Sequence, residues 1–149
     1  MITYQTEHLH DILDEFMPLL ARNIGEVDVA ECPAANINWD MYLGFDAQGV
    51  LHITTARVDG ELAGYALFFV LPDPHNAGRL MAEADVYYMA PEHRKGFAAI
   101  RLMREAEKEL KQRGCRHVVI RVNMEHDCSA VARYLKYRPI ETVWCKEFD

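Results

Sequence analysis

The sequence predicts a mixed α/β domain in which a sheet of six or seven strands is flanked by helices. Residues 86–89 are an apolar and aromatic run, as in a strand buried on both faces, and Pro91 ends this strand because it has no N–H for the ladder. From Phe97 on, apolar side chains recur every three or four residues, which indicates an amphipathic helix. Residues 116–122 form the next apolar strand, so the helix is a right-handed crossover between two parallel strands.

Local signals predict the other elements. Asp59-Gly60 between two apolar runs indicates a tight hairpin, and Gly114 ends the long helix. Pro18 interrupts the first helical pattern, so we expect a kink or two consecutive helices there. The expected strands are residues 1–5, 50–58, 61–71, 80–89, 116–122 and 140–148. The expected helices are residues 7–24, 39–45, 97–112 and 129–136, with loops at 26–38 and 72–78.

The composition indicates one packed domain over residues 1–149, since half of the residues are hydrophobic. No apolar run approaches the ~20 residues of a membrane helix, and no secretory signal is present, so we expect a cytoplasmic protein. The net charge of −7 argues against a general nucleic-acid binder, which needs a basic face. The four cysteines lie in no C-x-x-C or paired Cys/His spacing, which predicts reduced, mostly packed thiols and no zinc site: Cys32, Cys115, Cys128 and Cys145.

The turn between the central strand and the long helix is suited to binding an anion. A helix N-terminus offers unpaired N–H groups and the positive end of the helix dipole, which favours phosphate. Arg94 and Lys95 add positive charge, and Gly96 lets an anion approach the backbone closely.

At these residues the sequence resembles the GNAT acyl-CoA N-acyltransferases, whose signature is Gln/Arg-x-x-Gly-x-Gly/Ala. Here it reads His93-Arg94-Lys95-Gly96-Phe97-Ala98, in which His93 departs from the first position and Ala98 is an allowed variant. The hairpin over residues 54–65 is similar to the family's central hairpin, and residues 137–148 are similar to the closing strand of phage and prophage members. The resemblance implies a mostly antiparallel sheet with one parallel, splayed strand pair.

The resemblance also implies an acetyl-CoA-dependent enzyme that acetylates a primary amine by direct attack, without a metal. The backbone from Arg94 to Ala99, with the Arg94 and Lys95 side chains, would hold the CoA pyrophosphate. The main chain of the splayed strand, at Tyr87, Tyr88 and Met89, would bind the pantetheine arm and the thioester. The Met89 N–H would be the oxyanion donor. Asn123 lies at the end of the next strand, where an amide often contacts the cofactor arm.

Proton transfer requires further residues, because the attacking amine must lose a proton. Glu83 and Asp85 are the candidate bases; they lie two apart on one strand and so point the same way, and Asp85 is preferred. Asp85 is equally well a structural carboxylate that pairs with an arginine or caps a loop. The candidate acids for the leaving thiolate are Tyr134, in the short helix, and His126, although a thiolate can also leave without help.

Two rival functions are consistent with the same residues. A non-catalytic acyl-CoA-binding module would bind the cofactor without turnover, and a phage-type interaction factor that keeps only the fold would not bind CoA. The acceptor is not encoded in a readable motif: the N-terminal helices and residues 72–78 are expected to select it. The family often forms homodimers, and the last strand, with Trp144, offers an edge.

Overall fold

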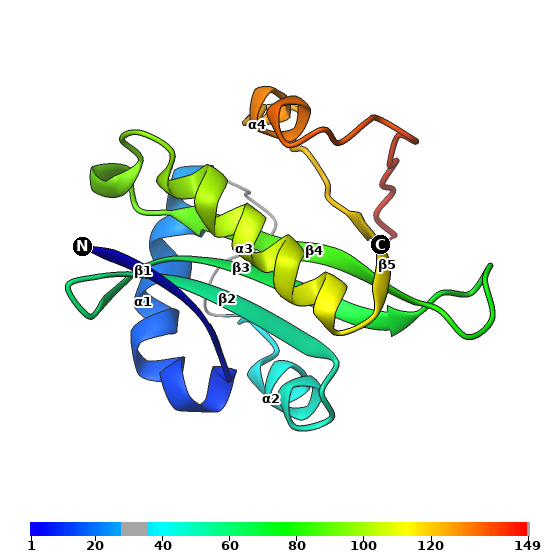
Figure 1. Ribbon diagram of the computed structural model, residues 1–149, viewed down its shortest axis with the longest axis horizontal. Helices are drawn as coiled ribbons and strands as arrows, with labels where there is room; N and C mark the ends of the chain where they lie inside the picture. Colours follow the sequence, from blue (N-terminus) through cyan, green and yellow to red (C-terminus); the bar gives the residue numbers. More distant parts are fainter. Residues whose placement is uncertain (28–35, 149) are drawn as a thin grey trace.

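A five-stranded sheet runs through the computed structural model, which describes residues 1–27 and 36–148. The strands are β1 (Ile2–Glu7), β2 (Leu51–Val58), β3 (Glu61–Pro72), β4 (Leu80–Met89) and β5 (Cys115–Val119). They lie in the order β1-β2-β3-β4-β5; the first three pairs are antiparallel and β4–β5 is parallel. The helices are α1 (Leu9–Val27), α2 (Trp39–Ala47), η2 (Pro91–His93), α3 (Ala98–Gln112) and α4 (Ser129–Tyr134) (Figure 1).

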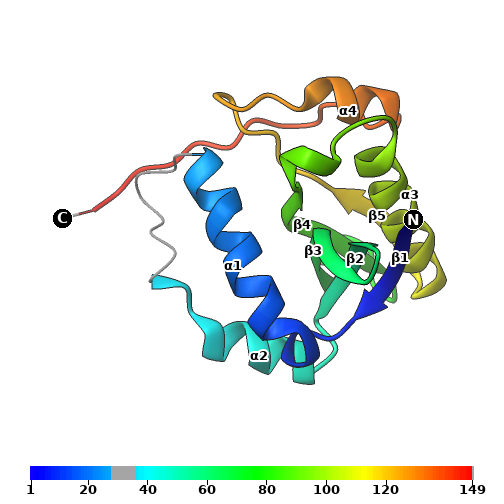
Figure 2. The same cartoon turned by 90° about the vertical axis from the view of Figure 1, so that its left-hand side faces the viewer.

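Helices cover both faces of the sheet, with α3 on one face and α1 and α2 on the other (Figure 2). The apolar stripe of α3, including Leu102 and Leu110, packs with Phe68 on one side. Phe16 of α1 packs with Tyr65 on the opposite side, their ring centroids 4.6 Å apart. The α3 helix is the crossover between β4 and β5, so the predicted parallel pair is confirmed.

The β2–β3 hairpin confirms the prediction made from Asp59-Gly60. Both residues have positive φ, 50° and 91°, the turn geometry that matches the twist of the flanking strands. The β3–β4 loop, by contrast, lies far from the predicted site, although residues 72–78 were expected to help select the acceptor. It precedes Leu80, at the opposite end of β4 from Met89 (Figure 1), so residues 72–78 do not overhang the predicted site.

Two further predictions about the fold need correction. The first helix is one element with Pro18 inside it, so the alternative of two consecutive helices is wrong; Phe16, Leu19 and Leu20 pack in the core on both sides of the proline. Residues 140–148 form no strand, and the described residues contain five strands instead of six or seven. The greater part of the predicted loop 26–38 lies outside the described residues.

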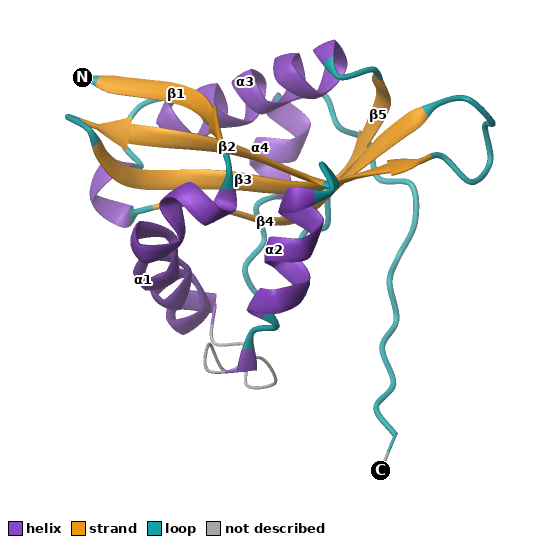
Figure 3. Cartoon of the chain, turned by 90° about the horizontal axis from the view of Figure 1, so that it is seen from below, coloured by secondary structure: helices purple, strands orange, loops and turns teal. Residues whose placement is uncertain are grey.

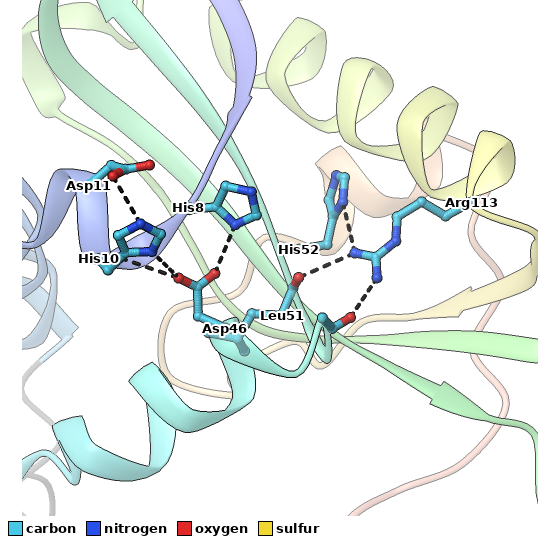
Figure 4. A network of polar contacts seen from close by, with 8 residues as sticks. His8, His10, Asp11, Asp46, Leu51, His52 and Arg113 are labelled. Atoms are coloured by element: carbon cyan, nitrogen blue, oxygen red, sulfur yellow. Dashed lines mark hydrogen bonds and ion pairs between the residues drawn. The ribbon is translucent and has the colours of Figure 1, made fainter.

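A polar network attaches the helices to one end of the sheet (Figure 4). The buried Asp46 of α2 accepts hydrogen bonds from the rings of His8 and His10, at 3.4 and 3.1 Å. Burial acts to raise the pKa of Asp46, but these histidines and the backbone N–H groups of α1 lower it below its usual range. Nearby, Arg113 donates to the Leu51 carbonyl and contacts the ring of the buried His52, which fixes the end of α3.

Candidate active site

The two parallel strands separate beside the predicted site. β4 pairs with β5 only from Leu80 to Glu83, and β5 ends at Val119. Beyond Glu83 the chain after β5 diverges from β4 toward α4 (Figure 1). The second half of β4, with Tyr87, Tyr88 and Met89, is therefore paired with β3 on one side, and no strand of the described residues pairs with it on the other.

The open side of β4 presents the predicted oxyanion donor. The Ala90 N–H donates to the Ala63 carbonyl of β3 at 2.8 Å. Because successive N–H groups of a strand alternate in direction, the Met89 N–H points away from β3, toward the side from which β5 has separated. A main-chain donor in this position can bind a developing oxyanion on a thioester carbonyl.

A β-bulge at Asp85 changes which side chains face each helix layer. Val86 is opposite Leu67 and Ala84 is opposite Phe68, which leaves Asp85 as the extra residue. Ala84 and Tyr87, three residues apart, consequently both pack in the core on the α3 face. Asp85 lies on the opposite layer, as alternation after Ala84 requires, and there it meets α2.

The Asp85 carboxylate meets Tyr42 of α2, whose hydroxyl donates a 2.5 Å hydrogen bond to it. The residue is solvent-accessible, yet the protein around its carboxyl disfavours the charged form, and this desolvation raises the pKa of Asp85. The hydrogen bond from Tyr42 and the charge of Arg121 oppose that rise without cancelling it. A raised pKa makes a carboxylate a better proton acceptor. Glu83, the other candidate base, lies 3.3 Å from the Arg121 guanidinium.

The turn before α3 has the features that phosphate binding requires. Gly96 has φ 69°, a conformation that favours glycine. Phe97 is the N-cap of α3 but makes no side-chain cap, and the first turn contains no acidic residue. The first helical bond runs from the Arg101 N–H to the Phe97 carbonyl, so the N–H groups of Ala98 and Ala99 have no partner in the helix. These residues fit the pyrophosphate of CoA.

The two basic side chains of the turn have different surroundings. Arg94 forms a bidentate pair with Glu26 of α1, at 2.6 and 2.8 Å, and its Nε donates to the Met89 carbonyl at 2.7 Å. Its guanidinium also lies over the Tyr88 ring, 5.2 Å from the centroid. Lys95 is exposed and pairs with no residue in the described part of the chain. In this structure the Arg94 side chain is thus directed to α1 and the strand, and Lys95 is the cation available to a phosphate.

The candidate acids lie on the α4 side of the site. The Tyr134 ring stacks on Phe97 at 6.1 Å, which places Tyr134 against the start of α3. His126 is exposed in the turn before α4, and its backbone N–H donates to the Asn123 side-chain oxygen. That oxygen also accepts from the Glu125 N–H, so Asn123 builds the turn. His93 ends η2, where its N–H donates to the Ala90 carbonyl.

Several residues near the site escaped sequence reasoning. Tyr42 comes from a helix 43 residues before Asp85, and no local pattern connects them. Glu26 stood at the edge of a predicted loop. Gly64 had a detectable signal, since a glycine within a strand often marks the close approach of another backbone. A Cβ at Gly64 would lie 2.8 Å from the Tyr88 carbonyl oxygen, so only glycine lets β3 lie this close to the end of β4.

Comparison with known families identifies the fold and its chemistry. The acetyltransferase (GNAT) family profile matches residues 7–138. The chain belongs to the GNAT acetyltransferase family. This GNAT protein is accordingly an enzyme that transfers an acetyl group from acetyl-CoA to an amine. No curated protein matches its sequence, and its resemblance to phage and prophage members stays a prediction.

Solved structures share the fold at low sequence identity. A ribosomal-protein-alanine N-acetyltransferase from Brucella melitensis biovar Abortus is 20% identical, with 100% of both chains covered and a TM-score of 0.73. An aminoglycoside acetyltransferase from an uncultured soil metagenomic sample, in complex with sisomicin, is 10% identical, with 99% and 95% covered and a TM-score of 0.74. A predicted acetyltransferase from Clostridium acetobutylicum, with acetyl-CoA, is 17% identical, with 99% and 96% covered and a TM-score of 0.71.

Two features are absent from the described residues. No helix among them is long and apolar enough to cross a membrane. Within residues 1–27 and 36–148, no group of three or more His, Cys, Asp or Glu side chains is arranged to hold a metal ion. Cys115 is buried, Cys128 is half-buried and Cys145 is exposed, whereas Cys32 lies outside the described residues.

Proposed function

We propose that this GNAT enzyme acetylates a primary amine by direct attack on acetyl-CoA, with Asp85 as the general base. The observation that carries the proposal is the position of Asp85: it is the bulged residue of β4, four residues before the Met89 N–H on the open edge of the strand. A proton acceptor and an oxyanion donor therefore belong to one short stretch of one strand. This is the arrangement that attack on a thioester requires.

Each step of the proposed reaction is assigned to a different part of the site. The turn from Lys95 to Ala99 holds the pyrophosphate, and the main chain of β4 binds the pantetheine arm. Asp85 takes the proton of the attacking nitrogen, and the Met89 N–H binds the oxygen of the tetrahedral adduct. When the adduct collapses, the C–S bond breaks and the thiolate leaves, protonated by Tyr134, by His126 or by water.

The acceptor is proposed to be a cationic amine. Asp85 and Glu83 place two carboxyl groups on the acceptor side of β4, and the chain as a whole carries a net charge of −7. The Tyr42 ring stands between Trp39 and Phe69, with centroid distances of 6.2 and 6.1 Å, and an aromatic wall beside carboxylates suits an ammonium group. Peptides, aminoglycosides and polyamines all present such a group, so α1 and α2 are the elements expected to choose among them.

Native mass spectrometry with acetyl-CoA, followed by an amine screen with detection of the released thiol, tests the proposal. We expect a one-to-one complex per chain, weakened in Lys95→Ala, and thiol release with at least one amine class. Binding without turnover for every amine would support the non-catalytic acyl-CoA-binding module. If no complex forms, the assignment of the phosphate turn is wrong, and an interaction factor that keeps only the fold becomes the better interpretation.

A further inference from the structure

One carboxylate connects the C-terminal end of α1 with the end of β4. α1 lies on the face of the sheet opposite α3 (Figure 3), and Glu26 is in its last turn. The two oxygens of Glu26 accept hydrogen bonds from the Arg94 guanidinium at 2.6 and 2.8 Å. One of these oxygens also accepts a hydrogen bond from the Tyr88 hydroxyl at 3.0 Å. Glu26 thus contacts β4 and the turn before α3 at the same time.

Glu26 gains nothing from its position within α1. The C-terminus of a helix carries the negative end of the helix dipole, so a carboxylate in the last turn is unfavourable there. The last turn of α1 contains no basic residue to offset it. The compensating positive charge comes from Arg94, whose hydrogen bonds lower the pKa of Glu26 below its usual range. The carboxylate therefore serves its contacts with β4 and the turn, and not the helix.

These contacts hold both residues that flank one peptide bond. The peptide between Tyr88 and Met89 carries the Met89 N–H, the proposed oxyanion donor. The Tyr88 side chain is buried on the α1 face, and its hydroxyl bonds directly to Glu26. Met89 is held indirectly, because the Nε of Arg94 donates to the Met89 carbonyl at 2.7 Å. The orientation of this peptide is thus fixed from both of its ends.

Arg94 reaches Met89 on the open side of β4. The N–H and the carbonyl of a strand residue point to the same side, and those of Met89 point away from β3, because the next N–H, of Ala90, points toward β3. Without a partner, the Met89 carbonyl would place the negative end of a dipole beside the developing oxyanion. The guanidinium bonds to that carbonyl and leaves the N–H to the substrate. Such preorganisation stabilises charge in a transition state.

A second ion pair joins α1 to the same stretch of chain without contacting the end of β4. Arg22, one helical turn before Glu26, forms a bidentate pair with Glu92 of η2 at 3.0 and 2.8 Å. The side chains of this pair are 49% and 52% exposed, close to the 41% and 38% of Arg94 and Glu26. No hydrogen bond joins it to residues 87–89 in the described part of the chain. The two pairs therefore distinguish attachment of α1 from control of the peptide.

We propose that Glu26 is a positioning residue for acetyl transfer, which acts through Arg94 and Tyr88 on the peptide that carries the oxyanion donor. The inference rests on the proposed role of the Met89 N–H and extends it to a residue of the acceptor-side helix. Loss of the carboxylate should slow the chemical step, because the peptide is less firmly oriented. It should not weaken acetyl-CoA binding, since the released guanidinium is free to turn toward the pyrophosphate.

Glu26→Gln tests this role, with Glu92→Gln as the matched control. Each change replaces the carboxylate of one bidentate pair by an uncharged group of the same shape. We expect kcat of Glu26→Gln to fall by ~10-fold, less than the ~10²-fold that a 1 Å displacement can cost. KM for acetyl-CoA should stay unchanged or decrease. Glu92→Gln should change both constants by about twofold at most, and thermal melts of the two variants should agree, since both side chains are exposed.

A double-mutant cycle with Arg94→Gln shows whether Glu26 acts through Arg94. If it does, Glu26→Gln should lower kcat by about twofold at most in the Arg94→Gln background, against ~10-fold in the wild type. The glutamine can still accept the Tyr88 hydroxyl, so the lost pair with Arg94 accounts for the effect. Glu26→Asp keeps the charge and should recover part of the rate.

Four results would overturn the positioning role. They are wild-type kcat in Glu26→Gln, equal losses in Glu26→Gln and Glu92→Gln, a raised KM for acetyl-CoA with unchanged kcat, and fully additive losses in the cycle with Arg94→Gln. Turnover of the wild type separates this inference from the proposed function. An active wild type with a silent Glu26→Gln would contradict the inference alone, whereas an inactive wild type would contradict the proposed transfer and with it the step that Glu26 serves.

Discussion

Replacing Asp85 by asparagine removes the proposed base and preserves the shape of the site. The amide oxygen of asparagine can still accept the Tyr42 hydroxyl, which lies 2.5 Å from the carboxylate. The side chain is exposed, so the variant should fold with a stability change below about 1 kcal/mol. An effect on turnover would therefore report chemistry and not damage to the fold.

The expected loss follows from the role and exposure of the residue. A positioned general base contributes ~10²–10⁴-fold. Because Asp85 is exposed, water can partly replace it as the proton acceptor, and we therefore expect the lower end of this range of rate loss. We expect kcat to fall by ~100-fold, which corresponds to about 2.7 kcal/mol of activation free energy. The affinity for acetyl-CoA should not change, since the phosphate turn is untouched.

Thiol-release kinetics as a function of pH provide the assay. Asp85 must be deprotonated to act, so the rate rises with pH as its carboxyl ionises. Desolvation raises the pKa of Asp85, so the rise in rate should occur at higher pH than for an ordinary aspartate. Tyr42→Phe removes a hydrogen bond that favours the carboxylate, so in this variant the rise in rate should occur at still higher pH.

Glu83→Gln is the matched control, because it neutralises the neighbouring carboxylate of the same strand. It loses a contact with Arg121 and one of the two negative charges that face the acceptor, so KM for the amine can rise while kcat should change by about twofold at most. Wild-type turnover in Asp85→Asn, or a larger loss in Glu83→Gln than in Asp85→Asn, would refute the assignment of the base.

The remaining predictions concern the turn, the close approach of two strands, and the acid stability of the fold. Lys95→Ala should raise KM for acetyl-CoA by ~10-fold with little change in kcat, as for the loss of one charged phosphate contact. Arg94→Ala should mainly lower kcat, because it removes the side chain that holds the end of β4. Steady-state kinetics distinguish the two patterns. Gly64→Ala should cost ~1–3 kcal/mol in denaturant unfolding through overpacking, whereas Gly44→Ala, with nothing within 4 Å of the new Cβ, should not destabilise. The folded-state pKa of Asp46 is lowered, so its stabilisation is present at neutral pH and is lost as pH falls through that pKa. The melting temperature of the wild type should consequently fall more steeply below pH ~4 than that of Asp46→Asn, and a parallel decrease would contradict this role.

Local chemistry allowed the sequence by itself to determine much of the fold and the reaction class. The turn at Asp59-Gly60 needs two residues that tolerate positive φ, and the strand–turn–helix around Gly96 depends on neighbours in the chain. The boundaries of β4 and the end of α3 at Gln112 were predicted for the same reason. The family signature in this stretch was sufficient to indicate acetyl-CoA.

Only the tertiary structure decided how the site is assembled, because its contacts join residues far apart in the chain. The bulge that singles out Asp85 is defined by the register with β3, and its partner Tyr42 arrives from a separate helix. Glu26 pairs with Arg94 across 68 residues, which no local pattern can specify. Residues 140–148 were predicted to be a strand, but a strand also needs an edge to pair with, and among the described residues this segment pairs with none.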